Sequence, residues 1–157
     1  MIFVVVGSQK FPFERLIREV DLLKEKGIIV DDVFAQIGPS SYIPRHLRWE
    51  RYLDKGLFDE MIQKCDLLVT HAGEGSIMTG LLCRKKVIAV PRYARLGEHV
   101  SDHQLEIARA LEKQHNIINV EKIEDLGRSI QTIDQCDLRP YRSEKQKIIE
   151  TISSFIG

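Results

Sequence analysis

Residues 66–80 read "DLLVTHAGEGSIMTG": an apolar run, a polar turn with two glycines, and a second apolar segment. The run at 67–70 predicts a buried strand, and the segment 76–84 predicts a helix. Gly73 and Gly75 give the turn backbone freedom, and Ser76 is a residue type that caps helices. A strand that passes directly into a helix is the repeating unit of α/β domains.

The same alternation continues on both sides of this stretch. Apolar runs predict further strands at 2–6, 33–37, 87–90 and 117–120, with a short one around 47–52. The helical spacing of apolar residues predicts further helices at 12–26, 57–64, 102–114, 123–133 and 143–156. The pattern predicts an α/β fold: a single Rossmann-like domain over residues 1–157, with a mostly parallel sheet and helices on both faces.

The composition is that of an ordinary globular domain, with 43% hydrophobic and 29% charged residues in a chain of 157. Lys plus Arg equals Asp plus Glu, at 23 each, so no overall field attracts nucleic acid and we expect no nucleic-acid partner. Three dispersed cysteines without a C-x-x-C argue against a disulfide framework or a zinc site and suit a reducing cytoplasm. No apolar run is long enough to span a membrane, so we expect any membrane role to be peripheral.

Four polar loops are expected at one edge of the sheet, because the carboxyl ends of parallel strands lie together and bind ligands in such folds. They span residues 7–10, 38–42, 71–76 and 92–104. The first has one glycine and no G-x-G-x-x-G pattern, so it gives little support to dinucleotide binding.

The turn at 71–76 allows two interpretations. Its glycines would let a phosphate approach the backbone beside the N–H groups and partial positive charge of a helix N-terminus. A tight strand-to-helix turn can also need glycine for its own geometry. The long polar loop at 92–104 favours function, although Asp102 can be explained as a helix N-cap and His99 and His103 as surface residues.

Several segments together resemble a known family. They are "VVVGSQKF" (4–11), "VFAQIGPSSYIP" (33–44), "HAGEGSIM" (71–78) and "VIAVPRYARLGEHVSDHQLEIA" (87–108). In this order they resemble the C-terminal, nucleotide-sugar-binding half of glycosyltransferase family 28 enzymes, which have the two-domain GT-B architecture. The similarity is greatest to a single-domain branch, which includes the catalytic subunit of a two-part dolichol-linked N-acetylglucosaminyltransferase and bacterial exopolysaccharide and capsule transferase subunits.

The resemblance implies two groups of site residues. The residues that bind UDP and the donor sugar are Gly73, Gly75, Ser76, Thr79, Arg92, Glu98, Asp102 and Gln104. The residues that face the cleft on the phosphate or acceptor side are Gly7, Ser8 and Gln9. Within the first group, Gly73, Gly75 and Ser76 match the diphosphate loop. Thr79 stands where many relatives have a glutamate that holds the ribose, so its single hydroxyl is a weaker partner.

The resemblance also implies the chemistry. We expect metal-independent, inverting transfer of a hexose from a UDP-sugar to a lipid-linked saccharide, with no cofactor. A helix N-terminus and Arg92 or Arg95 would stabilise the leaving UDP, and no D-x-D pair is present to hold a metal. His99 or His103 could take the proton from the acceptor hydroxyl, or the base could come from a partner.

Full-length relatives have two halves, and this chain matches only the donor half. The resemblance therefore implies a membrane-anchored, acceptor-binding partner and a peripheral position at the cytosolic face of the membrane. The final helix at 143–156 would either dock this partner or pack on its own sheet. The bacterial resemblance favours galactose or glucuronic acid transfer in exopolysaccharide or capsule synthesis. The alternatives are N-acetylglucosamine transfer to a lipid-linked sugar, a non-catalytic UDP-sugar-binding subunit, and an unrelated nucleotide-binding module.

Overall fold

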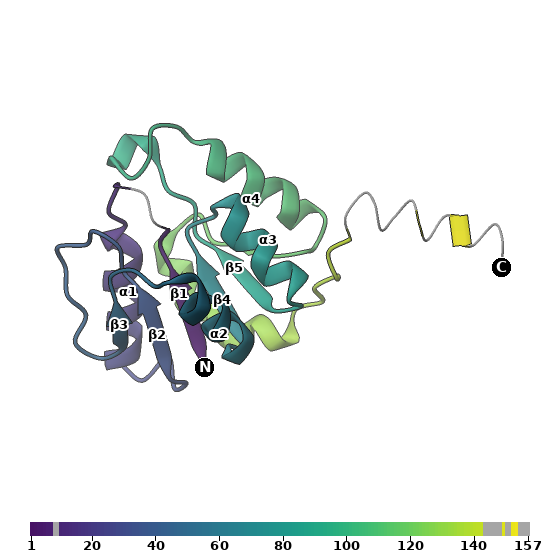
Figure 1. Ribbon diagram of the computed structural model, residues 1–157. Helices are drawn as coiled ribbons and strands as arrows, with labels where there is room; N and C mark the ends of the chain where they lie inside the picture. The colour runs from purple at the N-terminus through teal and green to yellow at the C-terminus, as the bar shows by residue number, and fades with distance from the viewer. Residues whose placement is uncertain (8–9, 143–148, 150–151, 154–157) are drawn as a thin grey trace.

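Six parallel strands form the centre of the computed structural model, which describes residues 1–7, 10–142, 149 and 152–153 (Figure 1). The strands are β1 (Ile2–Val5), β2 (Val33–Gln36), β3 (Arg48–Glu50), β4 (Leu67–Thr70), β5 (Lys86–Ala89) and β6 (Ile118–Asn119). Their order in the sheet is β3-β2-β1-β4-β5-β6, and every neighbouring pair is parallel. Every residue of β1, β2 and β4 is buried, which explains why these strands are apolar except for Gln36 and Thr70 at the ends of β2 and β4.

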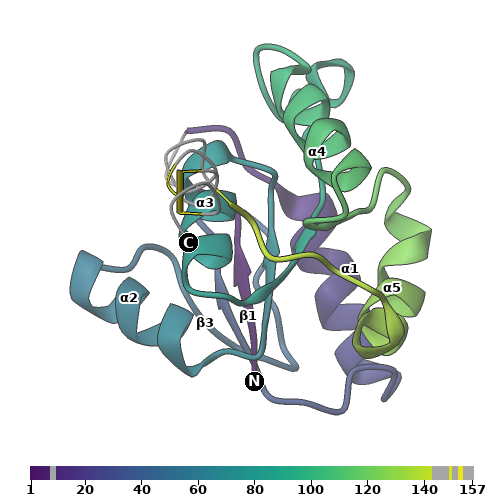
Figure 2. The ribbon, with the colours of Figure 1, turned by 90° about the vertical axis from the view of Figure 1, so that its right-hand side faces the viewer.

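Five α-helices cover the two faces of this sheet (Figure 2). They are α1 (Glu14–Glu25), α2 (Lys55–Lys64), α3 (Glu74–Leu82), α4 (His103–Lys113) and α5 (Leu126–Thr132). Alternate side chains of β1 point to opposite faces. Val4 belongs to the core formed with α1 and α5, whereas Phe3 belongs to the core formed with α2, α3 and α4. The predicted α/β, Rossmann-like fold with helices on both faces is confirmed.

The helix after β4 begins earlier than predicted. It starts at Glu74, with Gly73 at the N-cap position and no side-chain cap, so the prediction that Ser76 caps it is wrong. Ser76 lies in the first turn, where it contributes a backbone N–H group. The helix α2 also begins two residues early, because Asp54 accepts a 2.8 Å hydrogen bond from the Leu57 N–H group and caps it.

Other predicted segments differ from the structure in smaller ways. The helix predicted at 123–133 is α5 flanked by two short 3-10 turns, Ile123–Asp125 and Ile133–Gln135. A third 3-10 turn, Ala94–Leu96, lies in the loop after β5. Ser8, Gln9 and most of the predicted final helix at 143–156 lie outside the described residues. Within the part of the chain that is described, no helix is long and apolar enough to cross a membrane.

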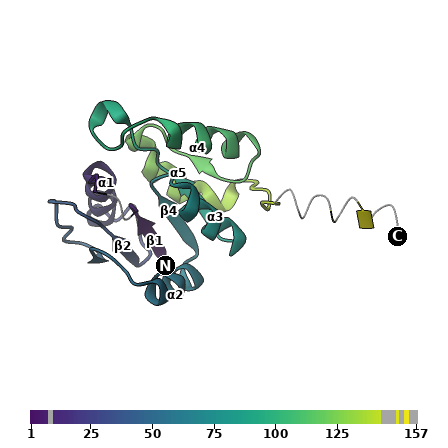
Figure 3. The same cartoon turned by 45° about the horizontal axis from the view of Figure 1, so that its top comes forward.

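The strand order places a crevice at the carboxyl edge of the sheet. From β1 the chain proceeds to β2 and β3 on one side, whereas β4, β5 and β6 extend on the other. The helices that follow β1 and β4, α1 and α3, therefore lie on opposite faces of the sheet (Figure 3). This reversal point is where open α/β sheets bind ligands.

Candidate functional site

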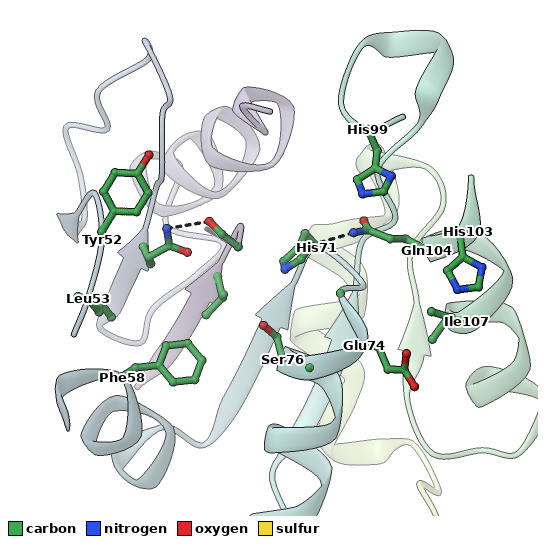
Figure 4. A pocket seen from close by; sticks show the side chains of 15 residues that line it. Tyr52, Leu53, Phe58, His71, Glu74, Ser76, His99, His103, Gln104 and Ile107 are labelled. Atoms are coloured by element: carbon green, nitrogen blue, oxygen red, sulfur yellow. Dashed lines mark hydrogen bonds between the residues drawn. The ribbon is translucent and has the colours of Figure 1, made fainter. Parts of the chain in front are cut away.

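A cavity of about 580 Å³ opens at this reversal point (Figure 4). Its walls come from the end of β1, the β3–α2 connection, the β4–α3 turn and the start of α4. Its volume lies in the range that small-molecule sites occupy. The predicted site residues that line it are Gly7, Gly73, Gly75, Ser76, His99, His103 and Gln104.

The β4–α3 turn presents unpaired backbone N–H groups to this cavity. The first intrahelical hydrogen bond runs from the Ile77 N–H group to the Gly73 carbonyl, so the first-turn N–H groups at Glu74, Gly75 and Ser76 lack helical acceptors. Ala72 is fully buried with a φ of 67°, a rare conformation for a residue with a side chain and one that often marks functional sites.

Neither glycine of the turn is required by a left-handed backbone, because neither has a positive φ. A Cβ atom at Gly73 would lie 2.2 Å from Cε1 of His71, so glycine is needed there for packing. A Cβ atom at Gly75 would meet nothing within 4 Å. Gly75 therefore leaves open space beside the helix N-terminus, and an anion can approach the amides there.

His71 lies in the turn at 71–76 but is not among the predicted site residues. Its ring is 7% exposed and lies between Gly7 and Gly73. Burial, with a smaller contribution from the nearby Arg92 charge, lowers the pKa of His71 to about 3. The imidazole is thus neutral at physiological pH, and its Nδ1 lies 3.4 Å from Nε2 of Gln104. Its position directly after a buried strand was the available signal.

Arg92 is not among the residues that line the cavity. Its side chain is fully buried, stacks 5.5 Å from the centroid of the Phe13 ring, and donates a hydrogen bond to the Val6 carbonyl. Its Nε and Nη1 have no partner among the described residues. Burial lowers the pKa of Arg92 to about 10, so the group remains positively charged at neutral pH.

Three further predicted residues also lie outside the cavity lining. Glu98 is 6% exposed and accepts two 3.0 Å hydrogen bonds from Arg15, which ties the long loop to α1. Asp102 accepts a 3.0 Å hydrogen bond from the Ala94 N–H group, and Thr79 donates to the Gly75 carbonyl at 2.8 Å. In this structure their contacts are within the chain, and their contacts with a ligand remain predictions.

The two candidate bases line the cavity from the α4 side. Nδ1 of His99 lies 3.2 Å from the Ser101 carbonyl oxygen, and Nδ1 of His103 lies 3.5 Å from the carboxylate of Glu106. Figure 4 shows both rings on the same side of the cavity as Gln104. Both are placed to take a proton from a bound molecule, and the choice between them remains a prediction.

An apolar wall faces the helix N-terminus across the cavity. It consists of Tyr52 and Leu53 from the β3–α2 connection and Phe58 from α2, a segment for which the sequence predicted only a loop and a short helix (Figure 4). Nearby, the Gln36 amide holds the strand ends together: it accepts from the Val6 N–H group and donates to the carbonyls of Gly7 and Arg51. The cavity therefore combines an anion-binding end with a surface for a flat ring.

No metal site was found in the described ranges: no group of three or more His, Cys, Asp or Glu side chains is arranged to hold an ion. The polar and aromatic groups that line the cavity are backbone amides, histidines, the side-chain amides of Gln36 and Gln104, the Ser76 hydroxyl, the Glu74 carboxylate and two aromatic rings.

Comparison with known proteins identified a family and several relatives. The model of the glycosyltransferase family 28 C-terminal domain matches residues 1–156. The protein "UDP-N-acetylglucosamine transferase subunit ALG13" of Homo sapiens is 32% identical over 126 residues, covering 74% of this chain and 10% of that protein. The Mus musculus protein of the same name is 28% identical over 124 residues, with 73% and 10% covered. The chain thus spans about a tenth of the length of these curated relatives.

Solved structures show the same fold. An NMR structure of ALG13 superposes with a TM-score of 0.64 at 16% identity, covering 97% of this chain and 94% of that one. The crystal structure of MurG from Acinetobacter baumannii gives a TM-score of 0.60 at 14% identity, covering 83% of this chain but only 40% of that one. The chain therefore has the architecture of one half of a GT-B glycosyltransferase.

Proposed function

Because the chain belongs to the glycosyltransferase family 28 C-terminal domain family, we propose that it binds UDP-N-acetylglucosamine as the donor-binding unit of a glycosyltransferase. The observation that carries this proposal is the open N-terminus of α3 at the reversal point of the sheet. The unpaired amides and the partial positive charge of the helix suit a diphosphate.

The sugar expected from the sequence is corrected by the relatives. We expected galactose or glucuronic acid transfer in exopolysaccharide or capsule synthesis. That expectation is wrong, because the curated relatives are named as UDP-N-acetylglucosamine transferase subunits. N-acetylglucosamine, which was the stated alternative, replaces it in the proposal.

The cavity suggests how the donor lies. The diphosphate would rest beside Gly75, where a side chain would otherwise stand. The uracil ring would lie against Tyr52 and Phe58, whose flat faces suit a base. The sugar would then extend toward Gln104 and His103 at the start of α4.

The transfer itself would be a direct displacement. The acceptor oxygen forms a bond to the anomeric carbon, the bond from that carbon to the β-phosphate oxygen breaks, and UDP leaves with the electron pair. The amides of α3 and the buried positive charge of Arg92 favour the growing negative charge on UDP. The acceptor proton would pass to His99 or His103, or to a base on a partner. We propose no metal or other cofactor.

A second polypeptide would supply the acceptor side. The relatives are named as subunits, and this chain matches only 40% of the MurG chain. We therefore propose a membrane-anchored partner that binds a lipid-linked saccharide and holds this chain at the cytosolic face. A domain that binds the donor without contributing a base is the second candidate, because the base can come from either polypeptide.

Donor binding can be tested by calorimetry with UDP, UDP-N-acetylglucosamine, UDP-galactose and ADP. We expect the uridine ligands to bind and ADP not to bind. Gly75→Asp places a carboxylate where phosphate belongs and should weaken UDP binding by about 100-fold or more, because like charges in a desolvated site cost several kcal/mol.

The matched control is Gly27→Asp, which adds the same charge in open space at the end of α1. It should leave UDP affinity unchanged. Unchanged UDP affinity in Gly75→Asp would remove the β4–α3 turn from the site. Selectivity for ADP would instead indicate an unrelated nucleotide-binding module.

A transfer assay separates the catalytic from the binding-only candidate. The purified chain is added to membranes that contain the partner and the lipid-linked acceptor, and sugar transfer from labelled donor is followed. If His99 or His103 is the base, its replacement by alanine should abolish transfer while donor binding persists. Full transfer by both variants would assign the base to the partner.

A further inference from the structure

The side-chain amide of Gln104 is held in one orientation in the structure. Gln104 is only 6% exposed, and its Nε2 lies 3.4 Å from Nδ1 of His71. Its Oε1 is buried and has no partner within the described ranges. Figure 4 shows the amide nitrogen facing His71 and the oxygen lying away from it. A buried carbonyl oxygen without a partner is unusual, and a bound ligand is one explanation for it.

The histidine that holds this amide is itself confined by two glycines. A Cβ atom at Gly7 would lie 2.8 Å from its Nε2, and one at Gly73 would lie 2.2 Å from its Cε1. The ring edge therefore packs directly against backbone on both sides, where any side chain would displace it. This confinement fixes where Nδ1 stands relative to Gln104.

The tautomer of the neutral ring determines which end of the amide it holds. A neutral ring whose Nδ1 is unprotonated accepts a hydrogen bond from the amide N–H of Gln104, and its own proton is then on Nε2. Burial and the positive charge of nearby Arg92 both favour the neutral ring. In the tautomer with its proton on Nε2, the ring holds the amide nitrogen, and the amide oxygen is left as an acceptor.

We propose that His71 is a positioning residue that orients the Gln104 amide so that its oxygen accepts a hydrogen bond from a hydroxyl group of the donor sugar. This inference rests on the proposed function, because it needs a sugar nucleotide in the cavity. The physical consequence is specificity: a ligand without a hydroxyl at that point leaves the buried oxygen unpaired, and such ligands are rejected strongly.

The test uses two variants matched in size. His71→Asn and His71→Leu both remove the outer ring atoms, but only asparagine keeps an acceptor near the position of Nδ1. The quantity measured is the ratio of the affinities for UDP-N-acetylglucosamine and UDP. We expect His71→Leu to lower this ratio by about tenfold, and His71→Asn to retain most of it.

A double-mutant cycle with Gln104 tests whether His71 acts on this ratio through the Gln104 amide or only through packing. In a Gln104→Ala background the amide is absent, so His71→Leu should no longer change the ratio. Equal losses of UDP and UDP-N-acetylglucosamine affinity in both His71 variants, with the ratio unchanged, would overturn the inference and leave His71 as a packing residue.

NMR spectroscopy distinguishes failure of this inference from failure of the proposed function. If the wild-type chain binds neither ligand, the proposed function falls. Even in that case, the ¹⁵N signals of the His71 ring in the free protein show which nitrogen carries the proton, and therefore which end of the Gln104 amide faces the ring. We expect an unprotonated Nδ1 and a protonated Nε2, with a Gln104 side-chain amide signal that shifts in His71→Leu. A proton on Nδ1 would overturn the inference.

Discussion

His71 explains why two residues at the carboxyl edge of the sheet must be glycine. Gly7 follows β1 and Gly73 precedes α3, yet both leave their side-chain space to one imidazole. At Gly7 a second constraint is present, since its φ is 84°, a conformation that strongly favours glycine. Two glycines far apart in the chain thus serve one buried ring.

Gly7→Ala should therefore destabilise the fold more than the backbone conformation alone explains. The control is Gly27→Ala, whose φ of 73° imposes a similar backbone cost but whose Cβ would meet nothing within 4 Å. We expect a loss of about 1 kcal/mol for Gly27→Ala and about 3 kcal/mol for Gly7→Ala in urea unfolding, because the latter also displaces His71. Equal losses would contradict the close packing.

For single residues, the sequence predicted which ones belong to the site but not which of their side chains are buried. Gly73, Gly75 and Gln104 were expected at a site and do line the cavity. Arg92 and Glu98 lie in a polar loop, and nothing local indicates that both side chains turn inward. Arg92 packs on Phe13 and Glu98 pairs with Arg15, and both partners lie at the start of α1, far away in the sequence. Patterns in a single sequence do not reveal such long-range contacts.

Among the elements, α3 matters most, because its first turn presents unpaired N–H groups at one end of the cavity, where we propose that the diphosphate binds. The helix rests closely on the sheet at Gly80, where a Cβ atom would lie 2.7 Å from the Leu68 side chain and 3.0 Å from that of Val87. Both of these side chains are fully buried. The distance between helix and sheet is therefore set six residues after the first turn begins.

Gly80→Ala and Gly75→Ala make the same exchange in one helix and should have opposite effects. Alanine favours a helix by up to about 1 kcal/mol, so Gly75→Ala, in open space, should raise the unfolding free energy. Gly80→Ala should lower it by about 1–2 kcal/mol, since overpacking outweighs that gain. Calorimetry should also show weaker UDP binding in Gly80→Ala, and a stabilised Gly80→Ala would disprove the close contact.

A second contact between elements joins α1 to the β2–β3 connection. Asp21 is 2% exposed and accepts hydrogen bonds from the Tyr42 hydroxyl and from the N–H groups of Arg45 and His46. Burial alone would raise the pKa of Asp21, but these hydrogen bonds outweigh it, and the pKa is lowered. One carboxylate thereby anchors a connection that has little regular structure.

Asp21→Asn should cost about 2–3 kcal/mol of unfolding free energy at pH 7, because the hydrogen bonds are to a charged acceptor. The folded pKa lies below the unfolded value of about 3.9, so this contribution is fully present above pH 4 and is lost as the pH falls through the folded pKa. The difference in unfolding free energy between the wild type and Asp21→Asn, measured by urea unfolding, should therefore become smaller in acid.

The control is Asp59→Asn, which removes the partner of an exposed ion pair with Lys55 and should have almost no effect. If the difference in unfolding free energy between the wild type and Asp21→Asn became larger in acid, that result would contradict a lowered pKa of Asp21.

The central strands were the most predictable elements. The strand β4 was predicted with its observed limits, because three apolar residues followed by a β-branched threonine, between polar neighbours, leave little choice. The start of α3 was missed by two residues, since serine was taken as the cap although glycine holds that position. The apolar wall was missed because Tyr52 and Phe58 come together only when the chain folds.

For the molecule as a whole, His71 links stability to pH. Its pKa is about 3 in the folded chain and about 6.5 when unfolded, so the unfolded state binds more protons between these values. Stability should consequently fall as the pH drops below 6.5, by about 2 kcal/mol between pH 7 and pH 5. His71→Asn cannot titrate, so its unfolding free energy should fall less over this interval. Parallel curves for the two proteins would contradict the neutral ring.

The faces of the sheet hold the fold together, whereas the edge of the sheet forms the candidate site. Both faces are packed with apolar side chains from β1 outward, and the cavity lies at one edge, where the strands end. The fold follows from that layering, whereas the site depends on four connections that meet only at the edge. This difference is why the sequence indicated the architecture more completely than the cavity.

The buried guanidinium of Arg92 has a consequence for experiments in solution. Its charge persists whether or not a nucleotide is present, and the adjacent helix N-terminus has the same sign. Neither feature distinguishes a sugar nucleotide from small inorganic anions, so orthophosphate, sulfate or chloride will compete for the same amides. Donor affinities measured in phosphate buffer will therefore be weaker than those measured in a zwitterionic buffer, and variants can be compared only at matched anion concentration.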